Sequence, residues 1–132
     1  MRQMNEITHI KRMVQLMLQI TNAEQFRELI DKQGLTIAVF RADWCSDCHY
    51  IDPFMPEVEE KYREKLTLIE VDVEAVEEIS QNLNILGIPS FVAFSAGQEI
   101  VRFVNKLRKT REEIEGFLDK AILVTETLKS QS

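Results

Sequence analysis

The sequence predicts an α/β domain, with a central mixed β-sheet flanked by helices on both faces. Three observations support this fold class. Strand-like apolar runs alternate with amphipathic, helix-like segments along most of the chain. The run Thr36–Phe40 is rich in β-branched and aromatic residues on both faces, which is typical of a buried parallel strand. Finally, Ala96-Gly97-Gln98 predicts a tight turn that would add an antiparallel hairpin.

Size and charge narrow the functional classes. The chain has 132 residues, which fits one domain, and 45% of them are hydrophobic, which is enough for a core. It carries 22 acidic and 16 basic residues, a net charge of −6, and no basic run. A nucleic-acid partner or a basic membrane-surface contact is therefore disfavoured. No stretch approaches the ~18 apolar residues of a membrane span, so we expect no membrane partner.

The first elements follow from local signals. Residues 1–15 are expected to be an N-terminal extension, either a surface appendage or an amphipathic docking helix, before a single domain at 16–126. The sequence predicts a strand at Leu16–Ile20 and a helix that begins at a capping box, Thr21 to Glu24. Gly34 is expected to end that helix.

The second half of the chain continues the alternation. A helix kinked near its start by Pro53 and Pro56 should follow the Thr36–Phe40 strand and the cysteine motif. Four further elements are predicted: strands at Leu66–Val73, Ser90–Phe94 and Glu99–Val104, and a short helix around Val76, Ile79 and Leu83. A capping box from Thr110 to Glu113 should start the last helix, followed by a polar, frayed tail at 127–132.

Both cysteines of the chain lie in one short motif, Cys45-Ser46-Asp47-Cys48. A structural disulfide normally closes a longer loop, so this pair indicates chemistry. The motif directly follows a predicted strand and begins a predicted helix. The unpaired N–H groups at the helix start favour a thiolate on Cys45, and Cys48 lies about one turn further on. This arrangement is typical of thiol–disulfide exchange.

The surrounding residues resemble the thioredoxin family. Trp44 precedes the first cysteine, Pro53 follows the second by five residues, and Gly87-Ile88-Pro89-Ser90 resembles the family's cis-proline segment. The resemblance covers roughly residues 16 to 124 and implies a thioredoxin-like fold. It also implies a protein-disulfide reductase in which Cys45 attacks the substrate disulfide and Cys48 resolves the mixed disulfide. Trp44, Ile88 and Pro89, with a cis Ile88–Pro89 bond, would then hold the substrate.

The resemblance further implies the partners. The substrates would be disulfide-containing proteins, and a flavoprotein thioredoxin reductase would regenerate the dithiol. No cofactor beyond the Cys45–Cys48 pair and no metal would be needed. Because the N-terminus lacks the apolar core of a secretory signal, we expect the cytoplasm.

Several positions depart from the family pattern. Ser46-Asp47 stands where Gly-Pro is usual, Val39 where the family has a buried aspartate, and Glu70 where it has a lysine. Asn105 falls near a family glycine. Asp47, His49 and Glu70 are therefore possible modulators of the cysteine pair. Asp47 is expected to disfavour the Cys45 thiolate and to make the couple more reducing.

The role of several polar residues stays open in the sequence. Glu70 could assist Cys48 or could simply end a strand in solvent. Asp43, Asp47 and Asp52 could form a solvated acidic cluster at the start of a helix. We expect a solvated basic loop at the end of the sheet, made of Lys106, Arg108, Lys109 and Arg111.

Other functions fit the cysteine motif less well. Cys45-x-x-Cys48-His49 matches a haem-attachment pattern, but the strand–helix alternation does not fit a haem protein. A zinc site is poorly supported because His9 lies in the extension, and an iron–sulfur cluster shared by two chains has no further support. A thioredoxin-fold binding domain or a redox sensor with little turnover remains the alternative, because Val39 and Glu70 depart from the family pattern.

Overall fold

Five strands form one mixed sheet in the order β1-β3-β2-β4-β5 in the computed structural model, which describes residues 17–131. Their bounds are β1 Leu18–Ile20, β2 Leu35–Arg41, β3 Thr67–Asp72, β4 Ser90–Ser95 and β5 Gln98–Phe103. Strands β1, β3 and β2 run parallel, whereas β4 is antiparallel to β2 and β5 to β4. The sequence-based prediction of a mixed sheet is confirmed.

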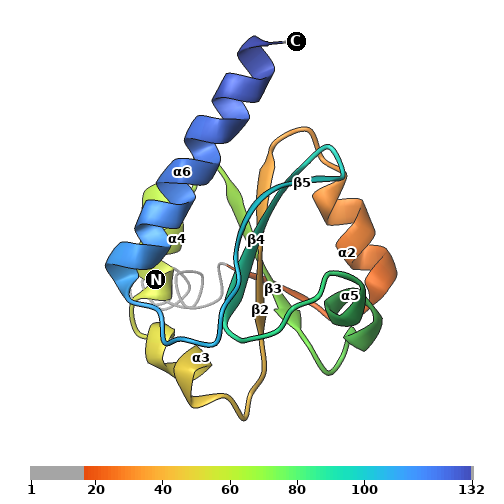
Figure 1. Ribbon diagram of the computed structural model, residues 1–132, viewed down its shortest axis with the longest axis vertical. Helices are drawn as coiled ribbons and strands as arrows, with labels where there is room; N and C mark the ends of the chain where they lie inside the picture. Colours follow the sequence, from red (N-terminus) through yellow and green to blue (C-terminus); the bar gives the residue numbers. More distant parts are fainter. Residues whose placement is uncertain (1–16, 132) are drawn as a thin grey trace, which may run out of the picture.

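Helices cover both faces of this sheet (Figure 1). Their bounds are α2 Ala23–Ile30, α3 Ser46–Ile51, α4 Met55–Tyr62, α5 Glu77–Asn82 and α6 Arg111–Ser130. One core cluster joins α3, α4 and α6 to the sheet, and a second joins α2 and α5 to its other face. Every residue of β2 is buried, as expected for a central strand with both faces covered.

The helix starts correct one local prediction and confirm another. Asn22, and not Thr21, caps α2, because its side-chain oxygen accepts the N–H of Gln25 at 2.8 Å. The predicted capping box of α6 is confirmed, with Thr110 and Glu113 bonding each other's backbone N–H groups. Both helices therefore start at a side-chain cap.

The helix ends also differ from the prediction. Helix α2 ends at Ile30 with Asp31 as its C-cap, so Gly34 does not end it. Helix α6 continues to Ser130, where a frayed tail was expected, and its far end extends beyond the sheet in Figure 1. The predicted extension at 1–15 lies outside the described residues.

Two breaks in the chain agree with the sequence signals. Residues 52–54, which include Pro53, separate α3 from α4. The predicted kink is therefore a short interruption between two helices. In the β4–β5 hairpin, Ala96 and Gly97 have φ angles of 52° and 81°, the left-handed values that such a turn requires.

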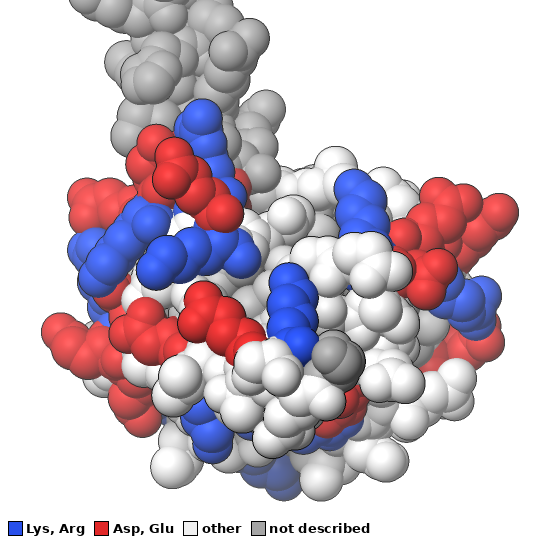
Figure 2. All heavy atoms as spheres, turned by 90° about the horizontal axis from the view of Figure 1, so that it is seen from above, with Lys and Arg blue, Asp and Glu red and all other residues white. Residues whose placement is uncertain are grey.

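The surface of the described residues shows mixed charge. Figure 2 shows acidic and basic side chains interspersed on the face seen from above, with no continuous basic patch on it. Within residues 17–131, every helix is too short or too polar to cross a membrane.

Candidate active site

The cysteine motif lies at the point where β2 ends and α3 begins. Cys45 is the N-cap of α3, with φ −87° and ψ 113°, and its Sγ accepts the backbone N–H of Cys48 at 3.2 Å. A sulfur that accepts a backbone N–H is stabilised as an anion. The sequence-based expectation that the two cysteines lie one helical turn apart, within reach of each other, agrees with this contact.

Both cysteines are buried. Cys45 retains 7% exposure and Cys48 none, because Ala42, Val73 and Ile88 pack around them. Cys45 is therefore the more accessible of the two. Burial, together with a hydrogen bond to Cys45, raises the pKa of Cys48 to about 12. Cys48 is therefore a thiol at neutral pH in the reduced protein.

The Ile88–Pro89 segment faces the first cysteine. Its peptide bond is cis, and the Cys45 thiol donates to the Ile88 carbonyl at 3.6 Å. Trp44, immediately before Cys45, is 70% exposed, and its indole N–H donates to Glu74. The structure therefore brings Trp44, Ile88 and Pro89 to the cysteine pair, as the resemblance predicted.

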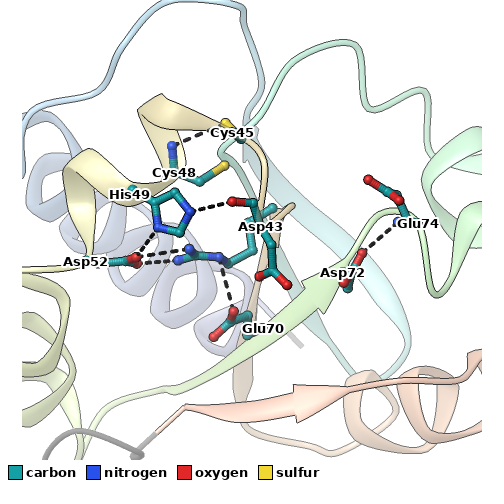
Figure 3. A network of polar contacts seen from close by, with 9 residues as sticks. Asp43, Cys45, Cys48, His49, Asp52, Glu70, Asp72 and Glu74 are labelled. Atoms are coloured by element: carbon teal, nitrogen blue, oxygen red, sulfur yellow. Dashed lines mark hydrogen bonds and ion pairs between the residues drawn. The ribbon is translucent and has the colours of Figure 1, made fainter.

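A network of charged side chains extends from Glu70 on β3 to α3 (Figure 3). The Arg41 side chain at the end of β2 is only 7% exposed and donates both terminal N–H groups to the Asp52 carboxylate. Its Nε lies 3.1 Å from Glu70 Oε1. His49 contacts Asp52 at 3.0 Å through Nδ1 and the Asp43 carbonyl through Nε2.

The network shifts the pKa values of its members in different directions. Burial opposes ionisation of Asp52, but hydrogen bonds from Arg41 and His49 outweigh it and lower the Asp52 pKa. The bonds of His49 to the Asp43 carbonyl and to Asp52 raise the His49 pKa. For Glu70 burial dominates over the attraction of Arg41, so its pKa is raised.

Glu70 and Val39 lie beside each other in the sheet, as register partners of β3 and β2. Val39 is fully buried in the core, so the position of the family's aspartate holds no polar group. The Glu70 side chain is 22% exposed and is paired with Arg41. It therefore neither ends the strand in open solvent nor stands as an unpaired carboxylate.

The basic loop before α6 is not the solvated loop that the sequence suggested. Arg108 Nε lies 3.0 Å from Asp47 Oδ1, and its guanidinium lies 4.6 Å from the centroid of the Tyr50 ring. Arg111 pairs with Glu57 and Glu115. Lys109 is buried, with 1% exposure. Of these four basic residues, only Lys106 is both exposed and without an ion pair to any residue in 17–131.

Sequence reasoning missed Arg41 and Lys109. Arg41 ends an apolar strand run, and a lone arginine there usually reaches solvent. Its burial depends on Asp52 and Glu70, which come from other elements. A weak signal for this pairing was present in the sequence, because Glu70 is also a charged residue within an apolar strand run. Lys109 gave no such signal in a loop of four basic residues.

A metal site is not formed by these groups. In the part of the chain from 17 to 131, no cluster of three or more His, Cys, Asp or Glu side chains is arranged to hold a metal ion. The two buried sulfurs face the cis-proline segment instead.

Comparisons with known proteins agree on one family. The family model described as "Thioredoxin" matches residues 17–120. Thioredoxin Y, chloroplastic, from Oryza sativa is 32% identical over 73% of this chain and 59% of its own length. A bifunctional thioredoxin reductase/thioredoxin from Mycobacterium leprae is 26% identical over 66% of this chain and 19% of its own length. The chain thus spans less than two thirds of these two relatives.

Solved structures share the fold. The crystal structure of Malassezia sympodialis thioredoxin superposes with a TM-score of 0.72 at 23% identity, covering 80% of this chain and 93% of that one. At this identity the likeness concerns the fold alone.

Proposed function

The chain belongs to the thioredoxin family, and we propose that it reduces disulfides of proteins through the Cys45–Cys48 dithiol. The observation that carries this proposal is the placement of Cys45. Its sulfur accepts a backbone N–H at the start of α3, contacts the Ile88 carbonyl and retains the small exposure that Cys48 lacks.

The geometry supports a two-step exchange. The Cys45 thiolate attacks one sulfur of the substrate disulfide, which forms a mixed disulfide and releases the first substrate thiolate. Cys48 then loses its proton and attacks the Cys45 sulfur, which releases the second substrate thiolate. Two protons end on the substrate thiols, and two electrons pass from the dithiol to the substrate. The product is a Cys45–Cys48 disulfide, and no cofactor beyond the dithiol takes part in these steps.

The rim of the site supports a protein substrate. Trp44 presents a 70% exposed ring beside Cys45, Ile88 is half-buried, and Pro89 is buried. An extended substrate segment can bond to backbone groups beside Pro89 while its disulfide meets Cys45. We therefore assign Trp44, Ile88 and Pro89 to substrate contact.

Regeneration requires an external donor of two electrons and two protons. The Mycobacterium leprae relative is named as a fusion of a thioredoxin reductase and a thioredoxin. This name supports a flavoprotein thioredoxin reductase as the donor for the present chain. A dithiol that works as a reductant needs a compartment that keeps thiols reduced, so we propose the cytoplasm. Fractionation with a compartment marker tests this location, and recovery in an oxidising compartment would contradict it.

The experiment that tests the function is disulfide reduction of insulin, with dithiothreitol or with NADPH and a thioredoxin reductase as the donor. The wild-type protein is expected to accelerate reduction, and Cys45→Ser to lose at least roughly a thousandfold of that rate. Binding of insulin without any acceleration would favour a binding domain over a reductase.

A trapping experiment separates the two cysteines. Cys48→Ser cannot resolve the mixed disulfide, so it is expected to accumulate one covalent adduct through Cys45. Peptide mapping by mass spectrometry identifies the linked residue. An adduct through Cys48 in the matched Cys45→Ser variant, at a similar rate, would reverse the assignment of the nucleophile.

A further inference from the structure

Lys109 holds a buried ammonium group within electrostatic range of the cysteine pair. Its side chain lies in the loop between β5 and α6, and the residue is 1% exposed, against 6% for Arg41. All three N–H donors are used. They bond to the Asn105 carbonyl at 3.2 Å, the Asn105 side-chain oxygen at 3.2 Å and the Leu107 carbonyl at 3.1 Å.

These acceptors are neutral, so the charge of Lys109 has no counter-ion. Among residues 17–131 no carboxylate lies within 4.0 Å of its Nζ. The Phe103 ring, with its centroid at 5.2 Å, adds a weak cation–π contact. Burying an unpaired charge is costly, and the burial lowers the Lys109 pKa. Stability alone gives no reason for a cation here.

Two contacts place the Lys109 loop against the cysteines. Arg108, the preceding residue, pairs with Asp47 between Cys45 and Cys48. Asn105, which holds the ammonium, packs on Gly87 so closely that a Cβ there would lie 2.3 Å from the Asn105 carbonyl oxygen. Gly87 in turn precedes Ile88, whose carbonyl accepts from the Cys45 thiol. The loop is therefore held to both sides of the dithiol.

The ammonium lies within electrostatic range of four acidic groups. They are Cys45 and Cys48, Asp47 on α3, and Glu113 on α6. Asp47 already pairs with Arg108, and Glu113 bonds to Thr110 in the capping box. The cysteines are the groups whose charge changes during exchange.

We infer that Lys109 is a positioning residue that stabilises the thiolate formed at the Cys45–Cys48 pair, above all the one that Cys48 carries as it attacks the mixed disulfide. This inference rests on the proposed function. Lys109 forms no covalent bond and gives up no proton. Cys48 releases its proton, its electron pair forms the bond to the Cys45 sulfur, and the substrate thiolate leaves and is protonated.

Two neutral variants test this role, Lys109→Met, which keeps the length of the side chain, and Lys109→Gln, which keeps N–H donors for the loop carbonyls. Thiolate absorbance of the reduced protein is followed against pH, and equilibrium with reduced and oxidised glutathione is measured at each pH. Without the cation the first thiolate should form at a higher pH. The disulfide should become about tenfold more favoured above that pH.

The pH dependence separates an electrostatic role from a structural one. Well below the midpoint the dithiol is neutral, so the variants should approach the wild-type equilibrium. Unfolding of the oxidised and reduced forms provides a second measurement. A purely structural role would destabilise both forms equally and leave the glutathione equilibrium unchanged at every pH, which would overturn the inference.

Lys106→Met is the matched control, because Lys106 is an exposed lysine in the same loop. It should leave the thiolate titration and the glutathione equilibrium close to wild type. An equal effect of Lys106→Met and Lys109→Met would also overturn the inference, since it would indicate the general charge of the loop. If the wild-type protein neither forms the Cys45–Cys48 disulfide with glutathione nor reduces insulin, the proposed function itself fails.

Discussion

Arg41 and Lys109 are two buried cations near the same pair of sulfurs, and they are held in opposite ways. The Arg41 guanidinium is bound by the carboxylates of Asp52 and Glu70, which come from the α3–α4 link and from β3. The Lys109 ammonium is bound by neutral oxygens of its own loop. The first cation joins segments of the fold. The second has no ion pair among residues 17–131 and lies within electrostatic range of sulfurs that become negative.

A buried cation can serve in two different ways, which depend on the groups that bind it. A cation between carboxylates fixes geometry, and the carboxylates weaken its field, so that only a minor attraction to the Cys48 sulfur remains. A cation among carbonyls is tolerated at a cost in stability and still acts on a nearby thiolate. Four substitutions test whether the two cations differ in this way.

The largest effect is expected for Arg41→Met. It leaves Asp52 and the partly buried Glu70 without their shared cation, which should cost about 3 kcal/mol of unfolding free energy. Urea unfolding of the oxidised and reduced forms measures this cost, which should be similar in both. The exposed pair of Arg63 with Glu60 provides the control, and Arg63→Met should change stability by less than about 0.5 kcal/mol. The distinction breaks if Arg41→Met shifts the thiolate titration more than Lys109→Met does.

A change of backbone packing should come next. Gly87→Ala places a Cβ 2.3 Å from the Asn105 carbonyl oxygen, so the loop that holds Lys109 must move. We expect the unfolding free energy to fall by about 2 kcal/mol. The thiolate should form at a higher pH, as in Lys109→Met. Gly116→Ala, in open space on α6, should instead gain about 0.5–1 kcal/mol. An unchanged thiolate titration in Gly87→Ala would show that the loop position does not matter.

Glu59 is a buried carboxyl group that has no hydrogen-bond or ion-pair partner among residues 17–131 and lies in a different part of the fold from the cysteines. It is 9% exposed, and burial raises its pKa to about 7, with a smaller contribution from Glu60. A raised carboxyl pKa contributes stability below the unfolded value near 4.5, and this contribution is lost as pH rises through about 7. Glu59→Gln does not titrate.

The unfolding free energy of Glu59→Gln, relative to wild type, should therefore be about 1–2 kcal/mol higher at pH 8 than at pH 4. Unfolding free energies at the two pH values measure this gain, and the exposed Glu64→Gln serves as the control. If the variant differs from wild type by the same unfolding free energy at both pH values, the buried carboxyl stays in one charge state.

The smallest effect is expected for Asp47→Asn. Asp47 is 29% exposed and already paired with Arg108, so solvent and the guanidinium both screen its charge. The direction expected from the sequence remains, with the thiolate favoured and the disulfide more oxidising, but the glutathione equilibrium should change only about twofold. A change of about tenfold or more would make Asp47 at least as important to the equilibrium as Lys109.

The fold could be predicted because its signals are local. The β2 run, the α6 capping box and the turn at Ala96-Gly97 each lie within a few residues, and the structure has all three. The two errors at α2 are also local. Asn22 and Thr21 are both good caps, so neighbouring candidates one residue apart could not be ranked.

The electrostatics of the site could not be predicted in the same way. The cysteine motif is contiguous, so Cys45 and Cys48 could be identified from the sequence. The charge state around them depends on Arg41, Glu70 and Lys109, which approach from different strands and loops. Lys109 and Lys106 look alike in the sequence, but the folded loop buries Lys109 against its own carbonyl groups and leaves Lys106 exposed.

Trp44 gives the molecule a spectroscopic signal of its own. It is the single tryptophan of the chain, and it lies next to Cys45 with its ring 70% exposed. A disulfide quenches the fluorescence of a neighbouring indole more strongly than a dithiol does. The emission intensity of the unlabelled protein should therefore follow the oxidation state of the cysteine pair in real time, while the wavelength of maximum emission changes little on unfolding.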